Sequence, residues 1–275
     1  MKKGINAWCF PEDWDAEKLF RTAKELGFRG MELNVEEKEG SIFTLDTTEE
    51  EIRRVTETAS KYGIEIFSIS TAMLWKCPLT SENRDTRQKG IDIVEKMVEI
   101  ASQCRAETVL VVPGLVTEDV SYDAAYKRAI EAIKRLSESA EEKKVTIGIE
   151  NVWNKFLLSP MEMRGFIEAI DSPLVGVYLD IGNLVHSGYP EQWIHLLSDQ
   201  LASVHIKDFK GTVGNIDGFV PLLAGDIDWM NVAEALKTNG YSGYIAPEIP
   251  PHPHHPEVLL KATSEIMDHF FHSIS

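Results

Sequence analysis

The chain reads VGVYLDIGN at residues 175–183, where a short apolar run rich in strand-forming side chains leads directly to a carboxylate, Asp180. A run of this length and composition is typical of a buried β-strand. Apolar runs of similar length recur along the chain, and a longer amphipathic segment follows each one. This alternation predicts parallel strands that are connected by helices.

The predicted strands are short and β-rich: Gly4–Cys9, Gly30–Val35, Ile64–Ser70, Thr108–Pro113, Val145–Glu150, Val175–Asp180, Ala202–Lys207 and Tyr244–Ile249. The predicted helices have helical apolar periodicity: Asp15–Leu26, Thr48–Tyr62, Asn83–Gln103, Tyr122–Lys143, Pro160–Ile170, Glu191–Leu197, Trp229–Thr238 and Leu259–Phe271. The ends of these predicted helices carry residues that are typical of helix caps. Thr48 supplies an N-terminal capping hydroxyl, and Gly27, Gly63 and Gly240 are placed to end helices just before a strand.

The repeated strand-helix unit favours a single (β/α)₈ TIM barrel of the α/β class, with residues 1–275 as one domain. The length of 275 residues and the 43% hydrophobic content suit one such core, and no Gly/Ser-rich linker interrupts the chain. A doubly wound open sheet is the alternative. The turn CFPED at residues 9–13 lacks the glycine-rich phosphate-binding fingerprint that nucleotide-binding folds of that type carry there.

The bulk composition excludes some classes of function. A formal net charge of −16 argues against nucleic acid as a partner, because phosphate backbones are bound by clustered Lys and Arg. No stretch approaches the roughly 20 apolar residues that span a bilayer, and the start MKKGINAWCFPEDWD contains no apolar leader, so no membrane partner is expected. Cys9, Cys77 and Cys104 are scattered and suit a reduced cytoplasmic protein, as buried small side chains.

Four consecutive predicted strands end on a side chain that can bind a metal ion: Glu150, Asp180, His205 and Glu248. The carboxyl ends of barrel strands converge on one face, so residues far apart in sequence can share one ion. Three carboxylates and one imidazole form a mixed oxygen and nitrogen site that suits a divalent metal, with Mn²⁺ expected and Mg²⁺, Co²⁺ or Zn²⁺ as alternatives.

The motifs GIEN (148–151), YLDIGN (178–183), VHIKD (204–208), GDIDW (225–229) and PEI (247–249) together resemble those of the xylose isomerase-like TIM barrels. This group includes sugar and sugar-phosphate isomerases and epimerases of the tagatose 3-epimerase type. The resemblance implies that Glu150 and Glu248 bind metal and also act as acid/base groups, whereas Asp180 and His205 only bind metal. The expected enzyme is a metal-dependent isomerase or epimerase of a small ketose or sugar phosphate.

The chemistry expected of such a site is proton removal next to a carbonyl. A metal ion stabilises the resulting cis-enediolate, and two carboxylates on opposite faces could invert the carbon. Return of the proton to the neighbouring carbon would instead give aldose–ketose isomerisation. Sequence leaves the choice open, together with phosphorylation of the sugar and assembly as a homodimer or tetramer.

Further residues near the strand ends are candidates for substrate binding: Asn183, His186, Lys207, Glu32, Trp75 and Trp153. Lys207 could bind a sugar phosphate or neutralise the carboxylates, and Glu32 could anchor substrate or pair with a cation. Trp75 is a candidate lid residue, and Trp153 could stack on a sugar face. The epimerase branch tends to have His in place of Asn183 and has Arg in place of Gly211, so this chain departs from that branch.

Three alternative functions and one alternative site remain. A keto-inositol dehydratase would use the same metal site, and a sugar-binding barrel without turnover would not need two proton-transferring carboxylates. An endonuclease-IV-like DNA repair enzyme would need further histidines where this chain has SIST (68–71) and VPG (112–114). The segment PPHPHHP (250–256) is interpreted as an extended loop with adventitious metal affinity.

Overall fold

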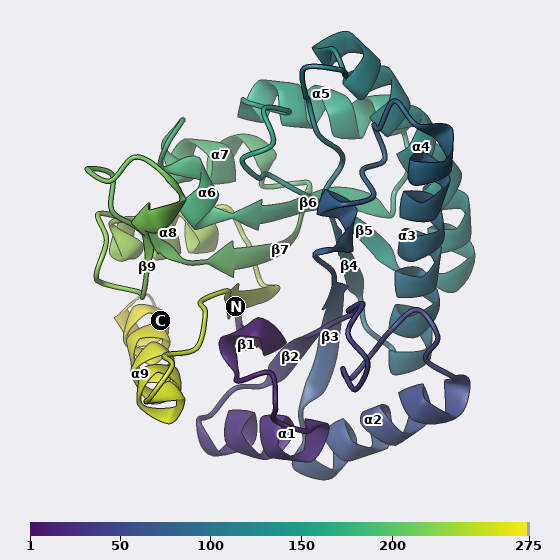
Figure 1. The fold of residues 1–275 in the computed structure, drawn as a ribbon. Helices are drawn as coiled ribbons and strands as arrows, with labels where there is room; N and C mark the ends of the chain where they lie inside the picture. The colour runs from purple at the N-terminus through teal and green to yellow at the C-terminus, as the bar shows by residue number, and fades with distance from the viewer. Residues whose placement is uncertain (274–275) are drawn as a thin grey trace.

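The structure consists of a central barrel of parallel strands surrounded by helices (Figure 1). The barrel strands are β1 (Lys2–Asn6), β2 (Gly30–Asn34), β3 (Glu65–Ser70), β4 (Thr108–Val111), β5 (Thr146–Glu150), β6 (Val175–Asp180), β7 (Leu201–Ile206) and β10 (Tyr244–Pro247). The sheet order is β1-β10-β7-β6-β5-β4-β3-β2, and β1 pairs with both β2 and β10. The sheet therefore closes on itself, and the predicted (β/α)₈ barrel is confirmed.

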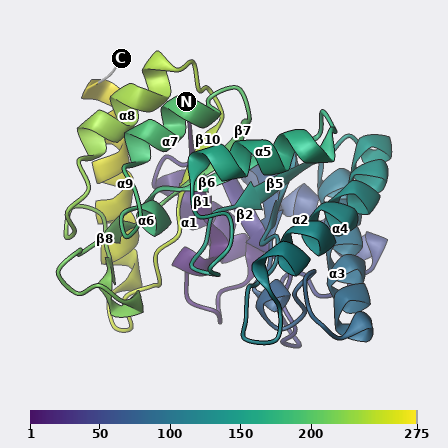
Figure 2. The ribbon, with the colours of Figure 1, turned by 90° about the horizontal axis from the view of Figure 1, so that it is seen from above.

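The computed structural model describes residues 1–273, so the predicted boundary of the domain at residue 275 lies outside the described part. The helices are α1 (Ala16–Glu25), α2 (Glu49–Tyr62), α3 (Arg84–Cys104), α4 (Tyr122–Lys143), α5 (Pro160–Ile170), α6 (Ile181–Leu184), α7 (Pro190–Leu197), α8 (Trp229–Thr238) and α9 (Pro256–Ser273). Neighbouring helices contact one another around the barrel, and α9 packs beside α8 (Figure 2). Among residues 1–273, no helix has the length and apolar character needed to cross a bilayer.

The helix ends follow the predicted capping chemistry. Thr48 caps α2 in a reciprocal capping box with Glu51. Gly63 ends the same helix in the left-handed conformation, with φ of 65°. Gly27 and Gly240 also have positive φ, each just after the end of a helix.

Several short elements on the strand-end face differ from the prediction. The first strand ends at Asn6 rather than Cys9, because the Asn6 side chain accepts a hydrogen bond from the Trp8 amide and begins a 3₁₀ turn, η1 (Ala7–Cys9). Two further 3₁₀ turns, η2 (Met73–Trp75) and η3 (Ile216–Gly218), were not predicted. Neither were α6 and the small antiparallel hairpin formed by β8 (Asp208–Phe209) and β9 (Phe219–Val220).

An aromatic pair closes the end of the barrel at which the strands begin. The rings of Phe67 and Tyr244 stack with centroids 4.2 Å apart, and both side chains are buried. The pair fits because a Cβ at Gly30 would lie 2.6 Å from Cε1 of Tyr244. The candidate site lies at the opposite end of the barrel, where the strands finish.

Candidate metal centre and active site

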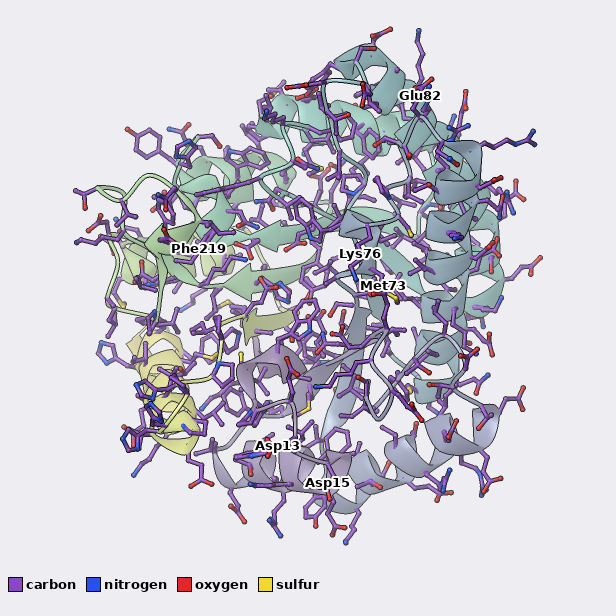
Figure 3. All side chains as sticks on the ribbon, in the orientation of Figure 1. Asp13, Asp15, Met73, Lys76, Glu82 and Phe219 are labelled. Carbon is purple, nitrogen blue, oxygen red and sulfur yellow. The ribbon has the colours of Figure 1, made fainter. Side chains whose placement is uncertain are left out.

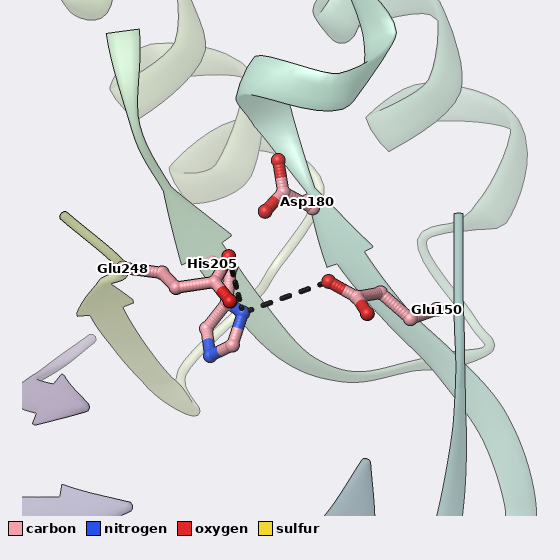
Figure 4. Close-up of side chains that lie close together, drawn as sticks. All are labelled: Glu150, Asp180, His205 and Glu248. Carbon is pink, nitrogen blue, oxygen red and sulfur yellow. Dashed lines mark ion pairs between the residues drawn. The ribbon is translucent and has the colours of Figure 1, made fainter. Parts of the chain in front are cut away.

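The four predicted metal ligands lie together at the carboxyl ends of β5, β6, β7 and β10. One ligand atom from each of Glu150, Asp180, His205 and Glu248 lies within 4.8 Å of the corresponding atoms of the others. Asp180 and His205 have no exposed surface, and Glu150 is 6% exposed. Figure 4 shows Glu150 and Glu248 approaching Nδ1 of His205 from two sides.

The ring of His205 is oriented so that one nitrogen faces the carboxylates. Nδ1 lies 3.8 Å from Oε1 of Glu150 and 3.7 Å from Oε2 of Glu248, and it has no hydrogen-bond partner although it is buried. Nε2 lies 2.7 Å from Oε1 of Glu32 on the other side of the ring. A buried nitrogen that faces three carboxylates without a partner is the arrangement expected of a metal ligand.

Glu32 lies in a polar layer inside the barrel, below the cluster. Its carboxylate accepts hydrogen bonds from the side chains of Asn6 and Tyr178, the latter at 2.6 Å, as well as contacting His205. Burial alone would raise the pKa of Glu32, but the charge of His205 and the hydrogen bonds to the carboxylate together outweigh burial and hold this pKa below its usual value. Glu32 has no exposed surface, which is compatible with pairing to a cation, and its contact with substrate stays a prediction.

The two candidate acid/base groups differ electrostatically. Burial raises the pKa of Glu150 to about 7, and the neighbouring carboxylates add to this effect. Burial also tends to raise the pKa of Glu248, but the charges of Lys207 and His205 hold this pKa below its usual value. For His205, burial is outweighed by the charge of Glu32 and by Glu150, so its pKa is well above the usual range.

Asp180 is fixed by the backbone that follows it. Its Oδ1 accepts from the amide of Asn183 at 2.8 Å, which makes Asp180 the N-cap of α6. The side-chain amide of Asn151 holds both backbone groups of Asp180, its N–H and its carbonyl, each at 2.8 Å. The other oxygen, Oδ2, is buried without a hydrogen bond and lies 2.9 Å from the ammonium nitrogen of Lys207.

The backbone on both sides of Glu248 contacts the thiol of Cys9 in η1. The thiol donates to the carbonyl of Pro247 at 3.1 Å, and its sulfur accepts from the amide of Ile249 at 3.4 Å. Cys9 and Cys104 are buried as predicted, whereas Cys77 is partly exposed, and all three are free thiols. Cys9 thus links η1, which follows β1, to the end of β10, where Glu248 lies.

Lys207 enters the carboxylate cluster directly. Its ammonium nitrogen lies 2.6 Å from Oε2 of Glu248 and 2.9 Å from Oδ2 of Asp180. The contact with Asp180 is an ion pair without a hydrogen bond to Oδ2. Burial would lower the pKa of Lys207, but the carboxylates outweigh it and raise this pKa. This position is compatible with neutralisation of the carboxylates by Lys207, and its contact with a sugar phosphate stays a prediction.

Comparison with known proteins agrees with the barrel fold. The family model described as xylose isomerase-like TIM barrel matches residues 20–269. The chain belongs to this family. It is 26% identical over 225 residues to L-ribulose-5-phosphate 3-epimerase UlaE of Salmonella paratyphi A, covering 81% of this chain and 78% of that protein.

One further relative and one solved structure extend the comparison. The putative L-ribulose-5-phosphate 3-epimerase SgbU of Haemophilus influenzae is 26% identical over 257 residues, covering 88% of this chain and 87% of that protein. The solved structure of a D-tagatose 3-epimerase-like protein has a TM-score of 0.84 at 23% identity, covering 100% of this chain and 98% of the other. At that identity the structural likeness shows the shared fold.

The predicted substrate-binding residues after β5 and β6 form a contact group on the rim. The Trp153 indole donates to the carbonyl of Asn183 at 2.9 Å, and its ring lies 5.1 Å from that of His186. The Asn183 side chain donates to the carbonyl of Asn151 at 2.9 Å and is 8% exposed, so it supports the loop. His186 is exposed. A contact of Asn183, His186 or Trp153 with substrate stays a prediction.

Trp75 lies at the end of η2, after β3, and is 43% exposed. An exposed indole on the strand-end face is compatible with the predicted lid role, which stays a prediction. The neighbouring Lys76 pairs with Glu37 of the loop after β2. The η2 turn is therefore tied to the adjacent loop of the rim.

The segment after β7 is organised by Asp208, which is fully buried. Its carboxylate accepts from the amides of Phe209 and Leu223, both at 2.9 Å, and from the Trp229 indole at 3.0 Å. A Cβ at Gly225 would lie 2.1 Å from Oδ1 of Asp208, so only glycine fits there. Asp208 thus holds the β8–β9 hairpin beside the cluster.

The histidines of the 250–256 segment are exposed and lie outside the metal cluster. Nδ1 of His252 accepts from the amides of His254 and His255, at 3.2 and 3.0 Å, and is occupied by these bonds. Among the described residues, Glu150, Asp180, His205 and Glu248 form the one group of clustered potential metal ligands. This supports the interpretation of the segment as an extended loop.

Sequence reasoning missed several residues that position the site. Asn151 and Asp208 lie within the motifs GIEN and VHIKD, so their place beside a ligand residue was a usable signal. Asn6, Tyr178 and Cys9 act through contacts across the barrel, between residues up to 240 positions apart. Spacing along one strand carries no signal for such contacts.

Proposed function

We propose that this protein is a divalent-metal-dependent epimerase that inverts carbon 3 of a small ketose or ketose phosphate. The observation that carries the proposal is the placement of two glutamates, Glu150 and Glu248, on two sides of one ligand cluster (Figure 4). The names of the relatives, two of them L-ribulose-5-phosphate 3-epimerases, favour carbon 3.

The residues present fit a divalent metal ion. Nδ1 of His205 and Oδ2 of Asp180 are buried without hydrogen bonds, and carboxylates with one imidazole suit Mn²⁺, our first choice, as well as Mg²⁺, Co²⁺ or Zn²⁺. Glu150, Asp180, His205 and Glu248 would hold the ion. Bound there, the ion would act as a Lewis acid that lowers the energy of negative charge on the substrate oxygens.

The two glutamates would carry the proton transfers. One carboxylate takes the proton from carbon 3, and the electron pair of the broken C–H bond delocalises onto the neighbouring carbonyl to give an enediolate. The other glutamate, in its protonated form, returns a proton to the opposite face of carbon 3. The glutamates exchange protonation states, no atom is oxidised, and one stereocentre is inverted.

The test is deuterium incorporation in D₂O followed by NMR, with Mn²⁺-loaded protein and a panel of ketopentoses, ketohexoses, their phosphates and 2-keto-inositol. We expect metal-dependent deuterium at carbon 3 together with the epimeric ketose. Deuterium at carbon 1 with an aldose product would indicate isomerisation, and loss of water from the inositol would indicate a dehydratase. Either result would overturn the assignment of carbon 3 inversion.

Two further proposals concern the setting of the enzyme. The three free thiols favour a reducing compartment, and we propose the cytoplasm. We also propose assembly as a homodimer or tetramer, as expected for barrels of this type. Sedimentation of the purified protein measures the assembly, and a monomeric mass would contradict it.

A further inference from the structure

The whole side chain of Lys207 packs against neighbouring residues. A Cβ at Gly182 in α6 would lie 2.5 Å from Cγ of Lys207, so the lysine stem packs directly on the helix backbone. The ammonium nitrogen lies 5.0 Å from the ring centroid of Phe219, in β9. Figure 3 labels Phe219 on the hairpin beside the barrel. Only 14% of the Lys207 side chain is exposed.

The ammonium of Lys207 uses oxygen atoms that belong to the metal cluster. Oε2 of Glu248 lies 2.6 Å from the ammonium and 3.7 Å from Nδ1 of His205, so it faces both groups. Oδ2 of Asp180 forms an ion pair with the same ammonium, at 2.9 Å. A divalent ion that takes these two oxygens must therefore take them from Lys207.

The charge of the carboxylates explains why a lysine ammonium is buried at this position. Three carboxylates close together and largely buried repel one another, and burial of an unpaired charge is costly. An ammonium at this point compensates two of them. A divalent ion would provide the same compensation more strongly, and it would repel the ammonium because both are positive.

We propose that Lys207 is an internal cation that holds Asp180 and Glu248 in the metal-free protein and gives up their oxygens when the metal ion binds. This inference rests on the metal site of the proposed function. Lys207 keeps the cluster assembled before metal arrives, and it weakens the affinity for metal because its ion pairs must break first.

The test is the affinity for Mn²⁺, measured by isothermal titration calorimetry on the wild type and on Lys207→Met, which keeps the length of the stem and removes the charge. We expect the variant to bind Mn²⁺ at least about tenfold more tightly, equivalent to about 1.4 kcal/mol. Lys210→Met is the matched control. Lys210 follows in the same segment but pairs with Asp226, so its removal should leave the affinity unchanged.

Equal or weaker binding by Lys207→Met would overturn the inference, since Lys207 would then support the bound ion instead of competing with it. Absence of Mn²⁺ binding by the wild type would instead refute the metal site of the proposed function. The two failures are therefore distinguishable.

Thermal unfolding provides a second measurement. Metal-free Lys207→Met should unfold at a lower temperature than the wild type, and Mn²⁺ should raise its Tm by more than it raises that of the wild type. If the variant folds only with metal, it is prepared with Mn²⁺ and its affinity is measured by competition with a chelator. Lys207→Arg retains the charge, so it should stay closer to the wild type. Equal Tm shifts in the wild type and Lys207→Met would contradict the exchange.

Discussion

Nε2 of His205 lies 2.7 Å from a carboxylate oxygen of Glu32, while Nδ1 of the same ring faces Glu150 and Glu248. Because the ionised Glu32 accepts a hydrogen bond from the Nε2–H group, the neutral ring carries its lone pair on Nδ1, toward the cluster. Glu32 thus fixes the tautomer and the orientation of the imidazole from a position that solvent does not reach.

Replacing Glu32 with Gln should weaken Mn²⁺ binding by about 10- to 100-fold, because an amide no longer fixes the ring tautomer or raises its basicity. Titration calorimetry measures the loss. Glu36→Gln removes a charge just beyond the same strand, at a residue bonded to the Trp8 indole, and should bind Mn²⁺ as the wild type does. Unchanged affinity in Glu32→Gln would rule out this role.

Glu150→Gln should abolish deuterium incorporation from D₂O while retaining part of the Mn²⁺ affinity, because the amide oxygen can still coordinate but cannot accept the proton. His205→Ala should lower the affinity itself, since it removes the nitrogen ligand. NMR exchange and metal titration on both variants separate the two roles. Equal loss of metal in both would contradict the division.

Metal binding should release protons. The pKa of His205 lies well above its usual value and that of Glu150 is about 7, so near neutral pH a metal ion must displace protons from the site. Affinity should fall as pH drops from about 8 to about 6, by up to about tenfold per pH unit for each proton displaced. Calorimetry in two buffers of different ionisation enthalpy counts these protons, and identical heats would exclude their release.

Asp208→Ala should destabilise the protein by about 1–3 kcal/mol, because it leaves buried donors such as the Trp229 indole without their acceptor. Denaturant unfolding measures the change. Asp217→Ala lies in the same segment, at an exposed residue, and should change the free energy of unfolding little. Equal stability of the two variants would show that Asp208 does not organise the segment.

The barrel and the four clustered residues were predictable because both depend on local pattern. Apolar runs that end on Glu150, Asp180, His205 and Glu248 specify strands, and barrel closure then brings their ends together. The short elements of the rim were not predictable, since single side-chain contacts create them. For example, β1 ends early because the amide of Trp8 donates a hydrogen bond to the side chain of Asn6.

The same limit applies to the role of Glu32. Its position at the end of β2 was visible in sequence, but its distance from His205 depends on how strands 173 residues apart in the chain face each other across the barrel. Lys207 was left with two possible roles for a similar reason. Only the fold shows which oxygens its flexible side chain reaches.

The stacked Phe67 and Tyr244 fill the barrel interior near the end at which the strands begin. Under the proposed function, we expect sugar and product to enter and leave on the opposite face, past the strand-end loops. Under the proposed function, the product leaves before the next sugar enters, and a proton taken from one sugar is shielded from bulk water while that sugar stays. Isotope washout per turnover should thus depend on how long this face stays covered.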